Sequence, residues 1–377
     1  MPGECEMKFS FFDQQLPEPL AIYLFSFLDA QTLAKTTQVC KEWNQLAEKT
    51  KQTNGLTPLI QHIPRLRAIA PYQLKLKQLS GGMTNLTYVV KQLKRVSTPA
   101  ERFVLRVPGK NTSSFINRQH EGYNARQTSQ LAINVTIEFF NDQDGLQLTR
   151  FFESSKPLIP ALLKEKHVLE NVAGIFRTLH QSHRFSNDIH LFQRNKELLK
   201  AIQDKAQLPL PKDLAAVEDS LAKIAAVCGK YKIPLKPCHN DPTPGNFLMS
   251  LTSFKLIDWE YSGNNDFLWD LVYFCMEGKL STEQEKQLLG YYFDKVTPTI
   301  EAWFEVYKPL VSWWITLWCW TQLNNKANAT ATEAYVKLAE TSYQATQASL
   351  KNPVCLEALA LIASDSEKTA FDGLRPF

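Results

Sequence analysis

The sequence lacks several features that would place it in common classes of protein. It has no run of about 18 apolar residues, so no membrane-spanning helix is expected. Its start, Met-Pro-Gly-Glu-Cys-Glu, has neither the basic nor the apolar segment of a secretory signal, and we expect no cleaved signal peptide. The seven cysteines are scattered without Cys-x-x-Cys spacing. This pattern predicts reduced thiols in a cytosol, without disulfides or a zinc site.

The chain also has no large net charge. The formal net charge is +4 over 377 residues, and no dense basic run occurs, so nucleic acid is not an expected partner. The seven histidines are scattered, which gives no transition-metal cluster. Hydrophobic residues make up 44% of the chain, enough at this length to fill more than one core, and we expect two or three domains.

Three polar residues in the second half of the chain carry the strongest chemical signal. Asp241 is followed by Asn246 after five positions and by Asp258 after twelve more. Phosphotransferases of the kinase type use this spacing for a base and two magnesium ligands. A carboxylate can accept the proton of an attacking hydroxyl, while amide and carboxylate oxygens suit Mg²⁺. The spacing therefore predicts phosphoryl transfer with Asp241 as base and with Asn246 and Asp258 on the metal.

The residues around this set predict how it is assembled. Pro242, Pro244 and Gly245 indicate an irregular loop, and residues 247–249 and 254–257 indicate the two arms of a short hairpin. Such a hairpin would bring Asn246 and Asp258 together. The alternative is that these are ordinary turn residues bordering a hairpin.

The strings His239-Asn-Asp and Ile257-Asp-Trp-Glu-Tyr261 resemble choline and ethanolamine kinases, which are relatives of the aminoglycoside phosphotransferases. The Asp-Phe-Gly and Ala-Pro-Glu signatures of protein kinases are absent. The resemblance covers about residues 72–350 and is strongest to bacterial choline kinases. It implies an α+β, bilobal, protein-kinase-like fold, ATP and Mg²⁺ as cofactors, and a small cationic alcohol as substrate.

The same resemblance implies a nucleotide site in the preceding part of the chain. Four features occupy the positions that the family uses for the nucleotide. They are a loop between two strands, an arginine on a strand, a glutamate in a helix at about residues 116–129, and a hinge segment. Small loop residues let backbone N–H groups approach phosphate oxygens, although Gly-Gly alone also fits a plain hairpin turn. The resemblance pairs the arginine with the glutamate. The nucleotide-binding candidates are Ser80, Gly81, Gly82, Met83, Thr84, Asn85, Arg106, Glu121, Phe151 and Phe152.

The acceptor site follows Asp258. By the resemblance, Tyr261 and Glu277 line the choline pocket with Asp241, and Asp270 braces the catalytic loop. Residues 311–320 contain four of the eight tryptophans, and helical spacing places Trp314 and Trp318 on one face. A quaternary ammonium is recognised by aromatic faces, so both become substrate-binding candidates. A tryptophan stripe on a helix also serves as core, and we expect two of the four to pack there.

A second resemblance lies at the start of the chain. Apolar residues recur at helical spacing in three short runs within residues 16–47. Leu-Pro, Phe-x-Phe-Leu-Asp and Val-Cys-Lys-x-Trp resemble an F-box, which implies a small all-α domain that binds the Skp1 adaptor of cullin ubiquitin ligases. A helical cap on the kinase is the alternative. The residues implied in this surface are Leu16, Pro17, Ile22, Leu24, Leu28 and Trp43.

Together these patterns predict an F-box at 9–52, a linker at 53–71, a kinase-like N-lobe at 72–153, a C-lobe at 154–363 and a polar tail at 364–377. Three functions stay open. The chain is a choline kinase joined to an F-box, an F-box adaptor whose kinase-like half is a binding platform, or an aminoglycoside-type phosphotransferase. The pairing of domains suggests a bacterial effector delivered into a host cytosol. Residues 184–237 show helical patterns near 191–206 and 213–231, and their role is left unassigned.

Overall fold

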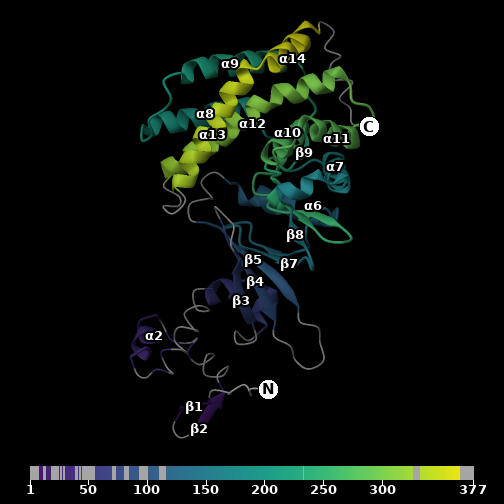
Figure 1. Cartoon of the computed structure of the whole chain (residues 1–377). Helices are drawn as coiled ribbons and strands as arrows, with labels where there is room; N and C mark the ends of the chain where they lie inside the picture. Colours follow the sequence, from purple (N-terminus) through teal and green to yellow (C-terminus); the bar gives the residue numbers. More distant parts are fainter. Residues whose placement is uncertain are drawn as a thin grey trace. The chain divides into compact units, whose positions relative to one another are not determined.

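The fold was analysed in a computed structural model (Figure 1). It divides into two compact units, one of residues 1–109 and 137–151, the other of residues 110–136 and 152–377. The chain therefore passes between the units three times, after Gly109, after Thr136 and after Phe151. The residues that the structure describes are 8–11, 14–17, 25, 28, 30–38, 41, 44, 56–69, 74–79, 85–92, 101–109, 116–231, 233–325 and 332–365.

The first unit contains a five-stranded antiparallel sheet with the order β3-β4-β5-β7-β6. Its alternating apolar side chains bury one face, as Phe103 and Leu105 do on β5. The register pairs Val90 with Phe103 and Leu105 with Leu148. The strands are β3 (Leu74–Leu79), β4 (Leu86–Gln92), β5 (Arg102–Val107), β6 (Ile137–Phe140) and β7 (Gln147–Arg150).

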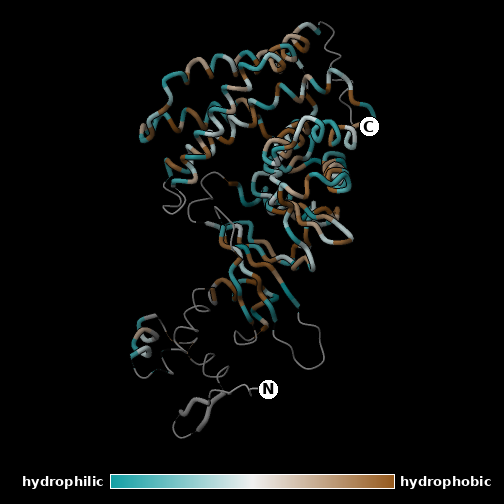
Figure 2. The backbone as a smooth tube through the Cα atoms, in the orientation of Figure 1, coloured by the Kyte–Doolittle hydropathy of each residue, from teal (hydrophilic) through white to brown (hydrophobic). Residues whose placement is uncertain are grey.

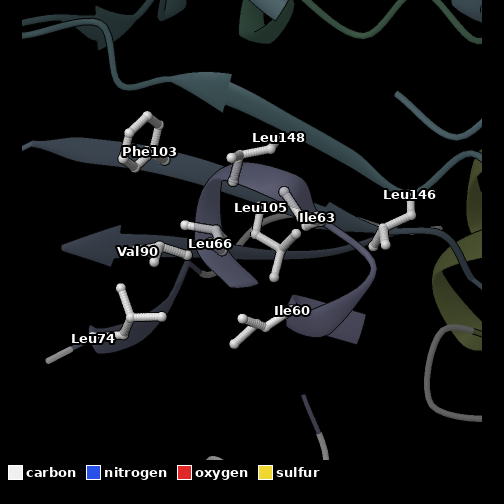
Figure 3. Close-up of a cluster of buried hydrophobic side chains, with 9 residues drawn as sticks. All are labelled: Ile60, Ile63, Leu66, Leu74, Val90, Phe103, Leu105, Leu146 and Leu148. Atoms are coloured by element: carbon white, nitrogen blue, oxygen red, sulfur yellow. The ribbon is translucent and has the colours of Figure 1, made fainter. Parts of the chain in front are cut away.

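Two short helices, α4 (Thr57–Gln61) and α5 (Pro64–Arg67), contribute to the core of this sheet. Ile63 and Leu66 are fully buried, and Figure 3 shows them among the sheet side chains. Residues 53–71 were expected to form a linker. Their described part instead belongs to the core of the sheet, because its apolar side chains are removed from water there. The buried cluster consists of Ile60, Ile63, Leu66, Leu74, Val90, Phe103, Leu105, Leu146 and Leu148.

The N-terminal segment differs from the all-helical domain expected there. Strands β1 (Lys8–Phe11) and β2 (Gln14–Pro17) form an antiparallel hairpin, and helix α2 (Ala30–Thr36) follows. Leu16 and Pro17 therefore lie on a strand, where Pro17 ends the pairing, and Leu28 lies in a half-buried bend. Ile22, Leu24 and Trp43 lie outside the described residues, so their predicted roles in an F-box stay predictions.

The second unit is mostly helical. Its strands form two small sheets, β11-β10-β8 and β12-β9. The strands are β8 (Lys156–Pro157), β9 (Lys236–Cys238), β10 (Phe247–Met249), β11 (Phe254–Leu256) and β12 (Gly263–Asn265). The helices are α6 (Arg118–Gln130), η3 (Pro160–Lys164), α7 (Lys166–His180), α8 (Leu191–Lys205), α9 (Leu214–Cys228), η4 (Pro244–Asn246), α10 (Leu268–Glu277), α11 (Thr282–Tyr292), α12 (Pro298–Asn325), α13 (Thr332–Lys351) and α14 (Pro353–Ser364). In Figure 1, β9 lies near α10 and α11, and β8 lies near α6.

Helix α12 organises this unit, because α8, α10, α13 and α14 all pack against it. The helices of this unit mix hydrophobic and hydrophilic residues along their lengths (Figure 2). Within the described part of the chain, no helix has the length and apolar character needed to cross a membrane. The stretch 184–237, whose role the sequence left open, supplies α8 and α9, in agreement with the helical patterns there.

Candidate active site

Asp241 lies in an irregular loop between β9 and η4, and Asp270 of α10 holds the start of that loop. Oδ2 of Asp270 accepts the backbone N–H of His239 at 2.7 Å, and Oδ1 accepts that of Asn240 at 2.8 Å. Asp270 is fully buried, and His180 Nε2 lies 3.2 Å from its Oδ2. Charge-assisted hydrogen bonds of this kind fix backbone geometry strongly. Asp270 therefore braces the loop, as the resemblance implied.

Asn240, directly before Asp241, adopts a left-handed backbone conformation with φ 68°. A residue other than glycine persists there only when its surroundings fix it. Its side-chain amide donates to the carbonyl oxygens of Tyr261 at 3.1 Å and of Gly263 at 3.2 Å, while its Oδ1 accepts from Asn265 Nδ2 at 2.8 Å. Sequence reasoning gave Asn240 no role of its own. Only its place beside Asp241 in the His-Asn-Asp string pointed to it.

His239 connects the loop of Asp241 with the strand that leads to Asp258. Its Nδ1 lies 3.3 Å from the backbone N of Asp241, and its Nε2 lies 2.9 Å from the carbonyl oxygen of Ile257. A neutral ring with the proton on Nε2 satisfies both contacts, since N–H groups donate and Nδ1 accepts. Burial lowers the pKa of His239, which favours this neutral form.

The predicted hairpin is confirmed: β10 and β11 pair antiparallel, with Phe247 opposite Leu256. It brings Asn246 and Asp258 to the same end, because the backbone N–H of Ile257 donates to the carbonyl oxygen of Asn246 at 2.9 Å. Asn246 Nδ2 donates to the carbonyl oxygen of Asp241 at 2.9 Å. The amide nitrogen is engaged, so Oδ1 of Asn246 is the atom available for a cation. With the Asp258 carboxylate it forms a hard oxygen set that fits Mg²⁺.

Negative charge is concentrated around Asp241. Burial raises the pKa of its carboxyl well above the usual range, a hydrogen bond from Tyr273 opposes the shift, and Asp258, Glu260 and Glu277 add to it. Like charges that share a buried site disfavour one another's ionised form. A divalent cation would offset this repulsion, which is a second reason why the residues fit a metal.

Tyr261 lines a cavity of about 220 Å³ in the second unit. Its hydroxyl accepts a hydrogen bond from Trp318 Nε1 at 2.8 Å, and its ring meets that of Trp314 edge-on at 6.2 Å. Neither Asp241 nor Glu277 is among the described residues that line this cavity. Its lining comprises Ile116, Asn117, His120, Glu121, Asn187, Ile189, Arg194, Leu198, Glu260, Tyr261, Ser262, Trp314, Trp318, Thr321 and Gln322.

The four tryptophans of residues 311–320, on α12, divide into two pairs. Trp313 and Trp320 contact each other at 5.8 Å, and Trp320 packs against Tyr343 of α13 at 5.8 Å, so this pair serves as core. Trp314 and Trp318 line the cavity, as their helical spacing predicted. However, the guanidinium of Arg194 covers the ring of Trp314 at 3.8 Å. That face is therefore occupied by a cation that belongs to the protein.

Arg194 was not among the site residues that the sequence predicted. It lies on α8, 120 positions before Trp314, and no local pattern connects the two. Burial lowers the pKa of Arg194 to about 10, so the guanidinium stays charged at neutral pH.

The nucleotide-binding candidates lie on both units. Arg106 is buried on β5, and Oδ1 of the buried Asn85 accepts the N–H of Gly109 at 3.3 Å. Phe151 is covered by the guanidinium of Arg102 at 4.4 Å. Phe152 is half-buried in the second unit. Ser80, Gly81, Gly82, Met83 and Thr84 lie outside the described residues.

Glu121 lies on α6, within the helix expected near residues 116–129. It is buried and pairs with Arg118 of the same helix at 2.5 Å, and Arg118 also reaches Glu260 at 3.7 Å. The expected pair between Arg106 and Glu121 joins residues of different units and stays a prediction.

Comparisons with known proteins agree with these features. The family model described as choline/ethanolamine kinase matches residues 76–296, and an F-box-like model matches residues 13–52. Protein LicA of Haemophilus influenzae is 30% identical over 232 residues, which are 60% of this chain and 65% of that protein. The chain thus spans slightly less than two thirds of this relative.

Two solved structures share the fold. A choline/ethanolamine kinase family protein from Mesorhizobium loti is 27% identical with a TM-score of 0.70, over 82% of this chain and 99% of that one. Choline kinase LicA from Streptococcus pneumoniae is 24% identical with a TM-score of 0.64, over 78% and 98%. The expected kinase-like fold and the expected family are confirmed. The chain belongs to the choline/ethanolamine kinase family and carries an F-box-like segment ahead of it.

Proposed function

We propose that residues 72–363 form an ATP- and Mg²⁺-dependent phosphotransferase that acts on the hydroxyl of choline or a similar small amino alcohol. The observation that carries this proposal is that hydrogen bonds connect the segments of the three polar residues to one another. Asn246 is tied to Asp241 through its side-chain amide, and to Ile257, just before Asp258, through the backbone. A base and two oxygen ligands on one frame are what phosphoryl transfer requires.

In the reaction, the acceptor hydroxyl oxygen attacks the γ-phosphorus of ATP as the bond to the β-phosphate oxygen breaks and ADP leaves. The hydroxyl proton passes to the carboxylate of Asp241. Asn246 and Asp258 would hold Mg²⁺, which supplies positive charge toward the phosphates and favours the ionised form of Asp241. Arg106 and the loop of residues 80–84 would bind phosphate oxygens.

A small acceptor is favoured over an aminoglycoside by the size and charge of the cavity. Its volume of about 220 Å³ lies below the range of about 300–1,000 Å³ for drug-sized ligands. Its two glutamates, Glu121 and Glu260, both lie near Arg118, which reduces the negative charge that a polycation would need.

The decisive experiment measures ADP release with choline, with ethanolamine, with an aminoglycoside and without acceptor. We expect release to depend on a small amino alcohol and to be lost in Asp241→Ala. Release that does not depend on the acceptor, or no release with any of them, would contradict the proposal. In that case the kinase-like half would be better described as a binding platform.

A second function is supported by the F-box-like match at residues 13–52. The segment would bind a Skp1-type adaptor and thereby bring the chain to a ubiquitin ligase of a eukaryotic host cytosol. Pulldown of Skp1 by the full chain is the test, with the double variant Leu16→Ala and Pro17→Ala. Binding that survives both substitutions would refute the assignment. Finding the chain only in the cytosol of its producer during infection would refute delivery to a host.

A further inference from the structure

Arg65 on α5 joins two carboxylates of the five-stranded sheet. Its Nη2 donates to both oxygens of Glu101, at 2.7 and 2.9 Å, and its Nη1 lies 3.5 Å from Oε2 of Glu138. The guanidinium also lies over the ring of Phe103, 5.1 Å from its centre. An isolated surface ion pair adds little, but a bidentate arginine within a network of charges holds its partners in one geometry. Arg65 therefore connects the start of β5 with β6, the two strands on either side of β7.

The first of these carboxylates is next in sequence to a residue that holds Phe151. Glu101 directly precedes Arg102, the first residue of β5. The carbonyl oxygen of Arg102 accepts the N–H of Phe151 at 3.0 Å, and its guanidinium lies over the Phe151 ring at 4.4 Å. A displaced Glu101 would thus disturb both the backbone contact and the ring contact of Phe151.

The second carboxylate contacts the residue on the other side of the same position. Oε1 of Glu138 accepts a hydrogen bond from Nε of Arg150, the last residue of β7. Phe151 follows, and the chain then leaves the first unit. The Glu138 side chain is only 14% exposed and has a guanidinium group at each of its two oxygens. Both partners of Arg65 therefore act on the point at which β7 ends.

These ion pairs do something that the apolar core does not. Ile63 and Leu66 already bury the helical segment against the sheet. Hydrophobic contacts of this kind have no preferred direction, whereas charge-assisted hydrogen bonds fix the orientation of the groups that they join. The network of Arg65 therefore adds orientation at the end of β7 to a segment that is attached without it.

Arg65 also lies outside both segments that match known families. The F-box-like match ends at residue 52, and the choline/ethanolamine kinase match begins at residue 76. Glu101 and Glu138, by contrast, lie within the kinase match. Neither family model therefore accounts for this arginine.

We infer that Arg65 is a positioning residue for the nucleotide, because through Glu101 and Glu138 it fixes the end of β7 at Phe151. This inference rests on the proposed phosphotransferase function and on Phe151 as a nucleotide contact. Arg65 itself touches neither substrate, and the transfer of the phosphoryl group with Asp241 as base is unchanged. Without Arg65 the sheet keeps its apolar core, but Phe151 is held less firmly and ATP binds more weakly.

Steady-state kinetics of the full chain test this role. Arg65→Met is expected to raise KM for ATP by about 3- to 30-fold, the range for a residue that acts through others, while kcat and KM for the acceptor stay nearly constant. Arg65→Lys keeps the charge but not the two-sided fork, and it should give an intermediate KM. Arg67→Met is the matched control, because Arg67 is exposed on the same helix and forms no ion pair with any residue that the structure describes.

Two results would overturn the inference. One is an unchanged KM for ATP in Arg65→Met, or an equal rise in Arg67→Met. The other is a lower kcat with unchanged KM in Arg65→Met, since a loss of folded protein alone reduces the amount of active enzyme and not its affinity for ATP.

Glu138→Gln examines the second contact and carries the test if Arg65→Met does not fold. Alone it is expected to raise KM for ATP. Added to Arg65→Met, it should raise KM by less than the product of the two single effects, because both changes remove the same ion pair. Effects that multiply fully would show that the two residues act independently, which would contradict the inference.

Binding of ADP separates this inference from the proposed function. The Kd for ADP with Mg²⁺ is measured by isothermal titration calorimetry, without acceptor, for wild type and Arg65→Met. If wild type binds ADP but phosphorylates no acceptor, weaker binding by Arg65→Met supports the inference while the proposed function fails. If choline or ethanolamine is phosphorylated in an Asp241-dependent manner but both proteins bind ADP equally, only the inference fails. No binding of ADP by wild type would overturn both.

Discussion

The side-chain amide of Asn246 donates a hydrogen bond to the main-chain carbonyl oxygen of Asp241 over 2.9 Å. The contact couples the orientation of the proposed metal ligand to the position of the proposed base. An aspartate at position 246 would offer oxygen to a metal but no N–H to the carbonyl. The contact with the carbonyl therefore requires asparagine at position 246, whereas the proposed coordination requires only a side-chain oxygen.

Replacing Asn246 with aspartate separates these two roles. We expect Asn246→Asp to lower kcat by about 10- to 100-fold and to shift the Mg²⁺ dependence, because a carboxylate facing a carbonyl oxygen would turn away. The measurement is kcat across a Mg²⁺ titration. Asn352→Asp is the matched control, since this exposed helix cap works equally well as aspartate. Wild-type kinetics in Asn246→Asp would show that the contact between Asn246 and the Asp241 carbonyl does not affect catalysis.

Asp270→Asn is expected to loosen the loop that carries Asp241. The carboxylate accepts two backbone N–H groups, whereas an amide offers one oxygen and turns an NH₂ group toward a donor. We expect unfolding free energy to fall by about 1–3 kcal/mol and kcat by at least about tenfold. Urea unfolding and steady-state kinetics measure the two effects.

The control for this change is Asp204→Asn, which breaks only an exposed pair with Lys200 on α8. Exposed pairs contribute about 0–1 kcal/mol, so little change is expected. If Asp270→Asn behaved like this control, the bracing role of Asp270 would be refuted.

Ile63→Ala tests whether the segment ahead of the sheet belongs to the sheet's core. Ile63 is fully buried between α4 and α5, and truncation of such a side chain costs about 2–5 kcal/mol. A clear drop in the thermal midpoint by circular dichroism is expected. The exposed neighbour His62→Ala should have little effect. Equal midpoints for the two variants would contradict a core role and show that residues 56–69 act as a linker.

We expect Asp266 to make the stability of the folded protein depend on pH. Burial raises the pKa of its carboxyl to about 6, although hydrogen bonds from the Tyr307 hydroxyl and the Leu268 N–H oppose the shift. The unfolded value is about 3.9, so between these values the folded state holds a proton that the unfolded state has lost. The contribution of Asp266 to stability is therefore full below about pH 4 and falls as pH rises through about 6.

Asp266→Asn should remove this dependence, because a neutral amide carries no ionisation cost. The unfolding free energy of wild type minus that of the variant is expected to fall by about 3 kcal/mol from pH 4 to pH 7, the equivalent of two pKa units. Urea titrations at both values measure it. A difference that is the same at both pH values would contradict the assignment to Asp266.

Local patterns in the sequence predicted the parts of the site that depend on neighbouring residues. The β10–β11 hairpin, α6, α8 and α9 are examples, because alternation and helical periodicity act over a few positions. The segment of α4 and α5 was missed since helices of four and five residues have no clear period. Pro58 and Pro64 stand at the first turn of each helix, where proline is tolerated.

Contacts between distant positions could not be predicted in the same way. Arg194 covers Trp314 across 120 positions, and Asn240 joins the carbonyl groups of Tyr261 and Gly263 from more than 20 positions away. Neither contact has a local signature, because both depend on how helices and loops pack. The resemblance pointed to the pocket of Tyr261 but not to the cation that this chain places in it.

The three crossings of the chain between its units determine how the gene can be divided. A fragment that ends at Gly109 would lack β6 and β7 and leave the hydrogen-bonding groups of β5 without their partner strand. An open edge of this kind promotes association with other chains. Expression of the F-box-like segment with the sheet must therefore extend through Phe151 and retain α6, whereas a cut ahead of residue 56 leaves all five strands of the sheet together.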